Sequence, residues 1–299
     1  MSGGAAGLLH SVAAYAEEFL AGLDQRRVRA DASVATLRDA VGGSLPEQGA
    51  PPEDVVRELV AGLEPGVVAT AGPRYFGFVV GGGLPAAVAA DWIAAAWDQN
   101  AFSTPLSPAA AAAEEVAAAW VAELLGIPAG ASYGLVTGTQ TAHLVALAAA
   151  RDELVRRSGR DPEEGLAGGE PVPVVVGEGR HASVDRALRL LGLGRGGLVV
   201  VGADEQGRML ADGLEEALAR LARPAIVCLQ AGNVNTGGVD PLAEAVPRAR
   251  ERGCWVHVDG AFGLWAAVSP SRRHLLAGVE GADFLAADGH KWLCGPEGA

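Results

Sequence analysis

The feature that most constrains this sequence is a series of short, wholly apolar runs that alternate with helical stretches from about residue 141 onward. Such runs predict strands buried on both faces, and the helices between them are typical of a largely parallel sheet covered on both sides. We therefore expect an α/β fold. The expected strands are 172–176, 198–201, 225–229, 255–258 and 284–287, and the expected helices between them are 141–157, 183–191, 214–221 and 242–252.

The N-terminal part of the sequence has a different pattern. Residues 5–25 place apolar side chains at the i, i+3/i+4 spacing of an amphipathic helix, and residues 55–63 predict a second, short helix. An Ala-rich stretch over 108–125 predicts a long helix that opens with proline in its first turn. We expect a helical N-terminal arm over 1–70 and a large domain over 71–299.

Composition and charge exclude several classes of protein. The net charge of −13 argues against a nucleic-acid partner, because binding a phosphate backbone requires a basic face. The most apolar stretches are interrupted by acidic residues, and no leader sequence precedes them, so neither a membrane span nor a signal peptide is expected. The three cysteines are far apart and form neither a metal-binding nor a disulfide pattern. We expect a cytoplasmic protein without a metal site.

Polar residues follow several of the expected strands directly. Asp259 follows the fourth strand, and Asp288, His290 and Lys291 follow the fifth, while His181 comes shortly after the first. Ligands of parallel sheets bind beyond the carboxyl ends of the strands, so these side chains are the first candidates for a site.

Lys291 is the only lysine in the chain, whereas arginine occurs 22 times. Arginine supplies positive charge, but only lysine offers an amine that readily loses its proton and attacks a carbonyl. An ordinary surface lysine is the alternative interpretation. The neighbouring His290 and Trp292, just after an apolar strand, favour a Schiff-base lysine.

The run Thr137-Gly-Thr-Gln-Thr141 precedes a helix and predicts an anion cradle made by free N–H groups at the helix N-terminus. A phosphate cradle, an imidazole, a carboxylate and an amine are the groups that pyridoxal phosphate requires. Each group taken alone has a structural interpretation. The cradle can be an ordinary helix N-cap, Asp259 can stabilise a loop or cap a helix, and His181 can be a hydrogen-bonded, partly buried histidine. His257 alternates with Val256 and Val258 and is expected to be structural. The conjunction of these groups at strand ends favours a cofactor site.

Four motifs carry a resemblance to a known family. They are Thr-Gly-Thr-Gln-Thr-Ala-His-Leu at 137–144, His-Ala-Ser-Val-Asp-Arg-Ala at 181–187, His-Val-Asp-Gly-Ala at 257–261 and Asp-Gly-His-Lys-Trp-Leu at 288–293. Together they resemble the group II pyridoxal-phosphate-dependent amino acid decarboxylases, which include the aromatic amino acid and glutamate decarboxylases. The resemblance covers about residues 70–299. It implies the aspartate-aminotransferase-like fold (fold type I), with a sheet of the seven-stranded type.

The resemblance also implies roles for individual residues. Lys291 would form the internal aldimine with pyridoxal 5'-phosphate, Asp259 would pair with the pyridine nitrogen, and His181 would stack on the ring as a third catalytic residue. Gln140 stands where many members have serine, so part of the phosphate contact would fall on Thr139 or on the backbone. The other cofactor contacts implied are Thr139 and Gln140 at the phosphate, Ala261 on the second ring face, and Asn235 and His290 near the cofactor.

The implied activity is decarboxylation of an aromatic or acidic L-amino acid by a homodimer with its site at the subunit interface. Another lyase or an aminotransferase on the same fold is the first alternative, because fold and lysine do not fix which bond at the α-carbon breaks. The sequence ends at Ala299, eight residues after Lys291, whereas members of the family continue further. We therefore expect either a fragment of a longer product or a truncated, non-catalytic remnant that binds cofactor or dimerises.

Overall fold

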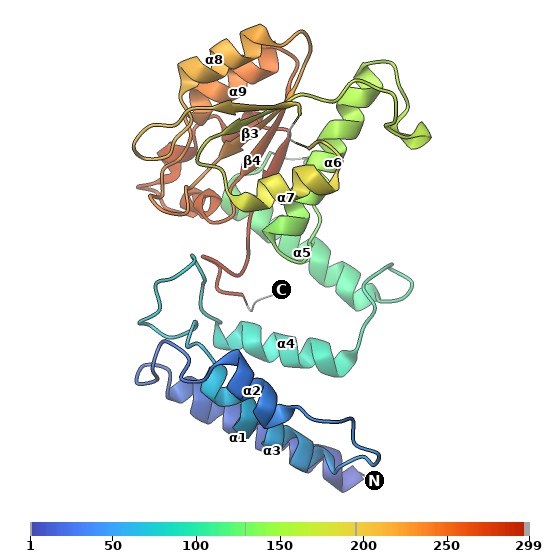
Figure 1. Ribbon diagram of the computed structural model, residues 1–299, viewed down its shortest axis with the longest axis vertical. Coiled ribbons are helices and arrows are strands. Elements are labelled where there is room, and N and C mark those ends of the chain that lie inside the picture. The colour runs from blue at the N-terminus through green and yellow to red at the C-terminus, as the bar shows by residue number, and fades with distance from the viewer. Residues whose placement is uncertain (1, 129, 195, 296–299) are drawn as a thin grey trace. The chain divides into compact units, whose positions relative to one another are not determined.

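The computed structural model describes residues 2–128, 130–194 and 196–295 (Figure 1). The chain divides into two compact units, one ending at Gly82 and the other beginning at Gly83. The first unit is helical, and the second contains the sheet.

The first unit is stabilised by contacts between its first helix and the end of its last one. Arg26 forms an ion pair with Glu64 at 2.7 Å, and its guanidinium lies 4.2 Å from the centre of the Phe19 ring. A half-buried pair of this kind, with a cation–π contact, fixes the arginine more firmly than an exposed ion pair does. The helices are α1 (Ser2–Ala21), α2 (Val34–Val41) and α3 (Pro52–Leu63), followed by a 3-10 turn over Glu64–Gly66.

The second unit opens with two Ala-rich helices, α4 (Pro85–Trp97) and α5 (Pro108–Leu125). Helix α5 begins as the sequence predicts, since the Ser107 hydroxyl accepts the N–H of Ala110 and proline occupies the first turn. It ends at Gly126, whose positive φ of 66° suits a residue without a Cβ. No residue of α4 is buried.

The sheet is wholly parallel among the described residues, with strand order β2-β1-β3-β4-β5. All five expected strands are present, with ends shifted by at most two residues. The strands are β1 (Val174–Gly177), β2 (Leu198–Val201), β3 (Ile226–Gln230), β4 (Trp255–Asp259) and β5 (Phe284–Ala286). The helices between and before them are α6 (Thr139–Arg157), α7 (Ala182–Leu190), α8 (Ala211–Arg220) and α9 (Leu242–Glu251), and short 3-10 helices cover Pro162–Glu164, Gly263–Val268, Arg273–Leu276 and Val279–Gly281.

The sheet has five strands in the described part of the chain, so the expectation of a seven-stranded sheet is wrong for these residues. The stretch 132–137, which the sequence pattern did not predict as a strand, adds none to the sheet. It contains Leu135 and Val136, yet it is exposed and pairs with no strand. A parallel strand is normally buried on both faces, and this segment has no such cover.

Helices cover both faces of the sheet. Figure 1 shows α8 and α9 on one face and α6 and α7 on the other. Alternate side chains of the strands divide between the two layers, so Val227 and Val258 face the α8–α9 side, while Val176 and Ile226 face the α6–α7 side. Leu147 of α6 is fully buried in that second layer, where burial of such a side chain contributes about 1.5–3 kcal/mol.

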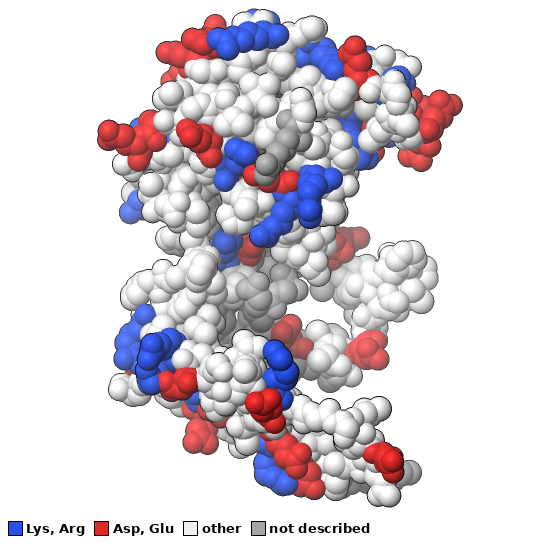
Figure 2. Space-filling model, in the orientation of Figure 1, with Lys and Arg blue, Asp and Glu red and all other residues white. Residues whose placement is uncertain are grey.

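Among the helices that the structure describes, none is long and apolar enough to cross a membrane. Acidic and basic side chains are interspersed on the face drawn in Figure 2, with wide uncharged areas between them. The excess of acidic residues therefore accompanies a mixed surface on this face, rather than separate acidic and basic regions.

Candidate active site

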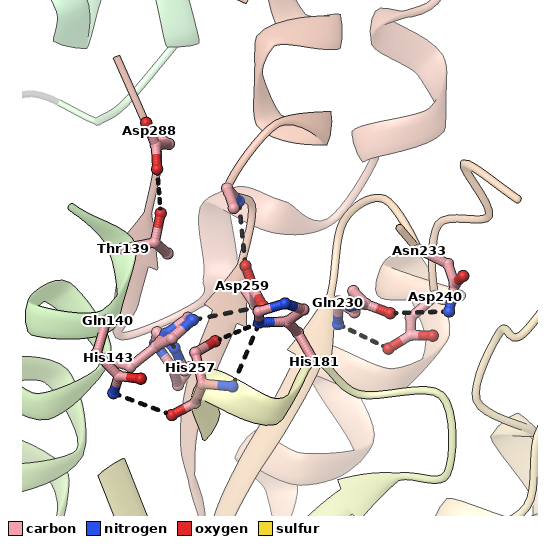
Figure 3. A network of polar contacts seen from close by, with 12 residues as sticks. Thr139, Gln140, His143, His181, Gln230, Asn233, Asp240, His257, Asp259 and Asp288 are labelled. Carbon is pink, nitrogen blue, oxygen red and sulfur yellow. Dashed lines mark hydrogen bonds and ion pairs between the residues drawn. The ribbon is translucent and has the colours of Figure 1, made fainter. Parts of the chain in front are cut away.

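The centre of the candidate site is Asp259, the last residue of β4. Side chains alternate along a strand, so Asp259 and His257 point to the same face, while Val256 and Val258 enter the opposite core layer. That shared face is covered by α6, which brings His143 against both residues (Figure 3). Asp259 retains only 5% of its accessible surface.

Three polar side chains form a buried line at this point. His143 Nδ1 and His257 Nε2 are 2.9 Å apart, and His143 Nε2 lies 3.4 Å from Asp259 Oδ2. The second contact has the distance of an ion pair without the alignment of a good hydrogen bond. The Ala261 N–H donates to Asp259 Oδ1 at 3.1 Å. A strand end and a helix face thus converge on one carboxylate.

The surroundings of Asp259 favour its ionised form. Burial alone raises the pKa of a carboxyl group, but the close polar contact and charge interaction with His143, the Ala261 N–H and His257 outweigh it, so the pKa of Asp259 is lowered. For His257 the balance is reversed. Burial, with a smaller contribution from His143, lowers the pKa of His257 to about 3, so this imidazole is neutral at physiological pH.

The expected anion cradle lies at the start of α6. Gly138 precedes the helix with a φ of 78°, and the N–H groups of Thr139 and Gln140 find no acceptor among the described residues. The Gln140 amide nitrogen donates to Ser183 O at 3.2 Å, whereas its buried Oε1 has no hydrogen-bond partner in the described structure. Backbone donors and the positive end of the helix dipole make this turn suited to an anion.

His181 is the N-cap of α7 and is exposed. Its Nδ1 accepts the N–H of Ser183 at 3.2 Å and lies 2.7 Å from the Ser183 hydroxyl. A backbone N–H only donates, so Nδ1 carries no hydrogen, and in the neutral ring the hydrogen is on Nε2. The cap therefore fixes both the orientation and the tautomer of this imidazole.

The segment that carries Lys291 is fastened at Asp288. The Asp288 carboxylate accepts the Thr139 hydroxyl at 2.7 Å and the His290 N–H at 2.9 Å, and its carbonyl accepts the Trp265 indole N–H at 2.9 Å. The ring of His290 donates from Nδ1 to the Gly295 carbonyl at 2.7 Å. Lys291, in the turn that follows β5, is half-buried.

A second buried acid, Asp240, connects the loops beyond β3. Its two carboxylate oxygens accept the N–H groups of Met209 and Gln230, each at 2.7 Å. Burial raises the pKa of Asp240 to about 6, although these two N–H groups oppose the shift. Nearby Asn233 is buried and donates to Gly179 O at 3.1 Å, whereas Asn235 is exposed on the following turn. The structure brings the side chain of Asn233 into this network, and Asn235 joins it only through its backbone N–H, which donates to Asn233 Oδ1 at 2.9 Å.

Two cavities adjoin Asp240. The smaller one lies at the carboxyl ends of β1, β3 and β4 and is lined by Gly179, Cys228 and Asp259, among others. The larger one, of about 390 Å³, includes Arg208 and His274 in its lining and contains neither Asp259 nor the lysine segment. Of the candidate site residues, Asp259 lines the smaller cavity.

Sequence reasoning did not single out His143 or Asp240. His143 lies on the buried stripe of α6, in register with Leu147, Ala150 and Leu154. A histidine on an otherwise apolar stripe, facing the side of β4 that carries His257 and an acid, was the available signal. Asp240 is preceded by a glycine pair in a loop and gives no comparable signal.

A parallel sheet with this strand order, an acid at the end of one strand and a lysine segment after its neighbour, defines the fold type I class of α/β domains. Residues 36–297 match the pyridoxal-dependent decarboxylase conserved domain, and the chain belongs to this family. The family and fold class implied by the sequence motifs are thereby confirmed.

Known relatives support the same assignment. The chain is 31% identical over 303 residues to tryptophan decarboxylase 1 of Oryza sativa subsp. japonica, covering 95% of this chain and 58% of that protein. It is 31% identical over 294 residues to the aromatic-L-amino-acid decarboxylase of Sus scrofa, covering 93% and 60%. The crystal structure of Oryza sativa TDC with PLP and tryptamine matches with a TM-score of 0.87 at 30% identity, covering 98% of this chain and 64% of that one. The chain thus spans about three fifths of the length of these relatives.

Proposed function

We propose that this chain binds pyridoxal 5'-phosphate and belongs to a decarboxylase of aromatic L-amino acids, with Lys291 as the cofactor lysine and residues 71–299 as the cofactor-binding domain. The observation that carries the proposal is the buried carboxylate of Asp259, which its neighbours hold ionised at the end of β4. The relatives named as tryptophan, tyrosine and aromatic-L-amino-acid decarboxylases favour an aromatic substrate over an acidic one.

The described residues fit the cofactor. Pyridoxal phosphate has an anionic end and a basic ring nitrogen, and each needs a partner of opposite character. The N–H groups of Thr139 and Gln140 provide a turn whose backbone donors have no acceptor among the described residues and can bind an anion. Asp259 provides the acid. Since the Thr139 hydroxyl already donates to Asp288, the phosphate contact falls on the backbone of this turn.

Each residue has a defined task in the proposed reaction. Pyridoxal phosphate, when bound, supplies an electron-accepting ring for the electron pair that departing carbon dioxide leaves on the substrate's α-carbon. Asp259 keeps a proton on the ring nitrogen, because an ionised partner stabilises the protonated form. Lys291 supplies the amine that holds the aldehyde, and the exposed, cap-oriented ring of His181 covers one face of the cofactor.

Borohydride reduction tests the cofactor assignment. The chain is incubated with pyridoxal 5'-phosphate, reduced, digested and examined by mass spectrometry, and a pyridoxyl group is expected on Lys291. Because Lys291 is the only lysine, the N-terminal amine is the only competing primary amine. Absence of the adduct from Lys291 rules out the proposed role.

The reaction is tested with a panel of L-amino acids. Release of carbon dioxide is expected from tryptophan, tyrosine or dihydroxyphenylalanine, and not from glutamate. Keto-acid formation without carbon dioxide would instead identify an aminotransferase. Faster release from glutamate than from every aromatic substrate would contradict the aromatic assignment.

The proposal includes a homodimer in the cytoplasm. Trp92 and Trp97 on α4 and Trp120 on α5 are exposed, and large exposed apolar side chains are typical of interaction surfaces. We assign a second copy of the chain to this surface. Sedimentation should give a dimer that dissociates on joint substitution of Trp97 and Trp120 by glutamate, while a monomeric wild type excludes it. All three cysteines are free, as is usual in a reducing compartment.

A further inference from the structure

The pair His143 and His257 is unusual for its position. Both imidazoles are fully buried between α6 and β4, where the surrounding side chains are apolar. Burial of polar groups costs free energy unless they are hydrogen-bonded, and apolar residues of the same size fill such a space more cheaply. No group of His, Cys, Asp and Glu in the described residues is arranged to hold a metal ion, so metal binding does not explain the pair.

The hydrogen positions follow from the contacts. An ionised Asp259 accepts hydrogen bonds only, so the nearer nitrogen of His143, Nε2, must carry the hydrogen that faces it. If His143 carries a single hydrogen, its Nδ1 is bare, and His257 donates from Nε2 across the 2.9 Å contact. The alternative, a doubly protonated His143 that donates from Nδ1 to His257 Nε2, is distinguished by the nitrogen-15 NMR experiment below.

We infer that His143 is a positioning residue for Asp259, presenting its Nε2–H to the carboxylate, and that His257 fixes this tautomer by donating to His143 Nδ1. The relay keeps the buried carboxylate oriented and ionised. The effect of this arrangement on cofactor binding rests on the proposed function of Asp259. Which ring nitrogens of His143 and His257 carry hydrogen can be tested in the cofactor-free protein.

Other groups near Asp259 do not replace the relay. The carboxylate interacts electrostatically with Cys228 of β3 and with Asp240 beyond that strand. A neutral thiol gives little charge stabilisation, and a second acid opposes ionisation. Burial raises the pKa of the Cys228 thiol to about 12, so it stays protonated. His143 and the Ala261 N–H are thus the two donors that face Asp259 in the described residues.

Nitrogen-15 NMR of the wild-type, cofactor-free chain tests the hydrogen order directly. At pH 7.5 we expect His143 and His257 each to carry hydrogen on Nε2 and to have a bare Nδ1. Assignments come from the spectra of His143→Gln and His257→Gln. A bare Nε2 on His143, or a doubly protonated ring, overturns the inference.

Carbon-13 NMR of the Asp259 carboxyl group tests the effect on charge, with Asp259→Asn for assignment. His143→Leu is expected to raise the midpoint of the Asp259 titration by about one pH unit, a tenfold change in proton affinity. His143→Gln keeps an N–H donor at a similar reach and should restore most of the shift. Identical midpoints in wild type and His143→Leu contradict the relay. If the leucine variant does not fold, the comparison is made with His257→Leu, which cannot donate to His143 Nδ1, so that loss of tautomer control predicts a smaller rise.

Cofactor affinity separates the relay from the proposed function. His143→Leu should bind pyridoxal 5'-phosphate about tenfold more weakly than wild type, the size expected for losing a hydrogen bond to a charged group, while His143→Gln stays close to wild type. A wild type that binds no cofactor, with the expected NMR order, rejects the proposed function and leaves the relay standing. Equal affinities for wild type and leucine variant reject the relay's role in binding.

Discussion

The Thr139 hydroxyl donates a hydrogen bond of 2.7 Å to the Asp288 carboxylate, which joins the first turn of α6 to the segment carrying Lys291, 149 positions later in the sequence. The anion cradle and the lysine segment are therefore held together by protein contacts alone. Asp288 also accepts the His290 N–H, so one side chain organises both parts.

Replacing Thr139 with valine tests this connection. Valine has nearly the shape of threonine but leaves the half-buried carboxylate without its hydroxyl donor, so the free energy of unfolding should fall by about 1–2 kcal/mol. Urea denaturation measures the change. Thr141→Val is the control, because the Thr141 hydroxyl makes only a 3.2 Å bond to the Thr137 carbonyl in an exposed turn. Equal losses in the two variants would show that the Asp288 contact adds nothing.

Lys291→Arg retains the positive charge and removes the amine that forms a bond with an aldehyde. We expect the variant to lose the borohydride-stable pyridoxyl adduct while keeping the stability of the wild type to within about 0.5 kcal/mol, as for most changes outside the core. Mass spectrometry and urea denaturation provide the two readouts. If the variant gives as much adduct as the wild type, the adduct forms on the N-terminal amine and not on Lys291.

His181→Asn separates capping from cofactor contact. Asparagine is a good N-cap, so α7 and the free energy of unfolding should be preserved, whereas His181→Ala should lose about 1 kcal/mol. Both variants lack the imidazole and should bind pyridoxal 5'-phosphate more weakly. Wild-type affinity in His181→Asn would refute the proposed ring contact, and the alanine variant shows that the stability assay detects the cap.

Asp240→Asn tests the raised pKa of the buried acid. Folding raises the pKa of Asp240 from 3.8 to about 6, so the folded state binds a proton more tightly than the unfolded state. The resulting stability is fully present below the unfolded pKa and is lost as pH rises through about 6. Between pH 7.5 and pH 5 the wild type should therefore gain about 1 kcal/mol relative to Asp240→Asn. Parallel urea titrations measure this difference, and a constant difference contradicts the raised pKa.

The strands and most helices were predictable because burial on both faces leaves a continuous apolar run in each strand. Strand β2 has the predicted bounds, and α9 differs from its prediction only at its last residue. Helix α2 was not predicted, although Val34, Leu37 and Val41 are spaced as on one helix face, because eight residues are too few for a clear helical period. The extra strands of the expected sheet came from resemblance, and the exposed residues 132–137 do not provide one.

The site was predictable where a residue directly follows a strand, as Asp259 does. His143 was missed because its role depends on a contact between two elements. The 3.6-residue repeat of α6 decides which face of the helix carries His143, and the two-residue repeat of β4 decides which face of the strand carries Asp259. Their meeting point is a tertiary contact, and sequence spacing alone does not determine which helix covers which face. Asp240 was missed for a similar reason, since its partners are Met209, in the loop before α8, and Gln230, the last residue of β3.

The pairing of β4 with β5 places Asp259 opposite Ala286, two residues before Asp288. Neighbouring strands in a sheet lie about 4.8 Å apart whatever their side chains, so backbone pairing sets the interval between the acid and the start of the lysine segment. An insertion within the exposed residues 270–275 should lengthen the connection before β5 and leave that interval unchanged. The length of such a connection can therefore vary without affecting the site. A shift of β5 by one residue against β4 would instead displace the whole segment that carries Lys291.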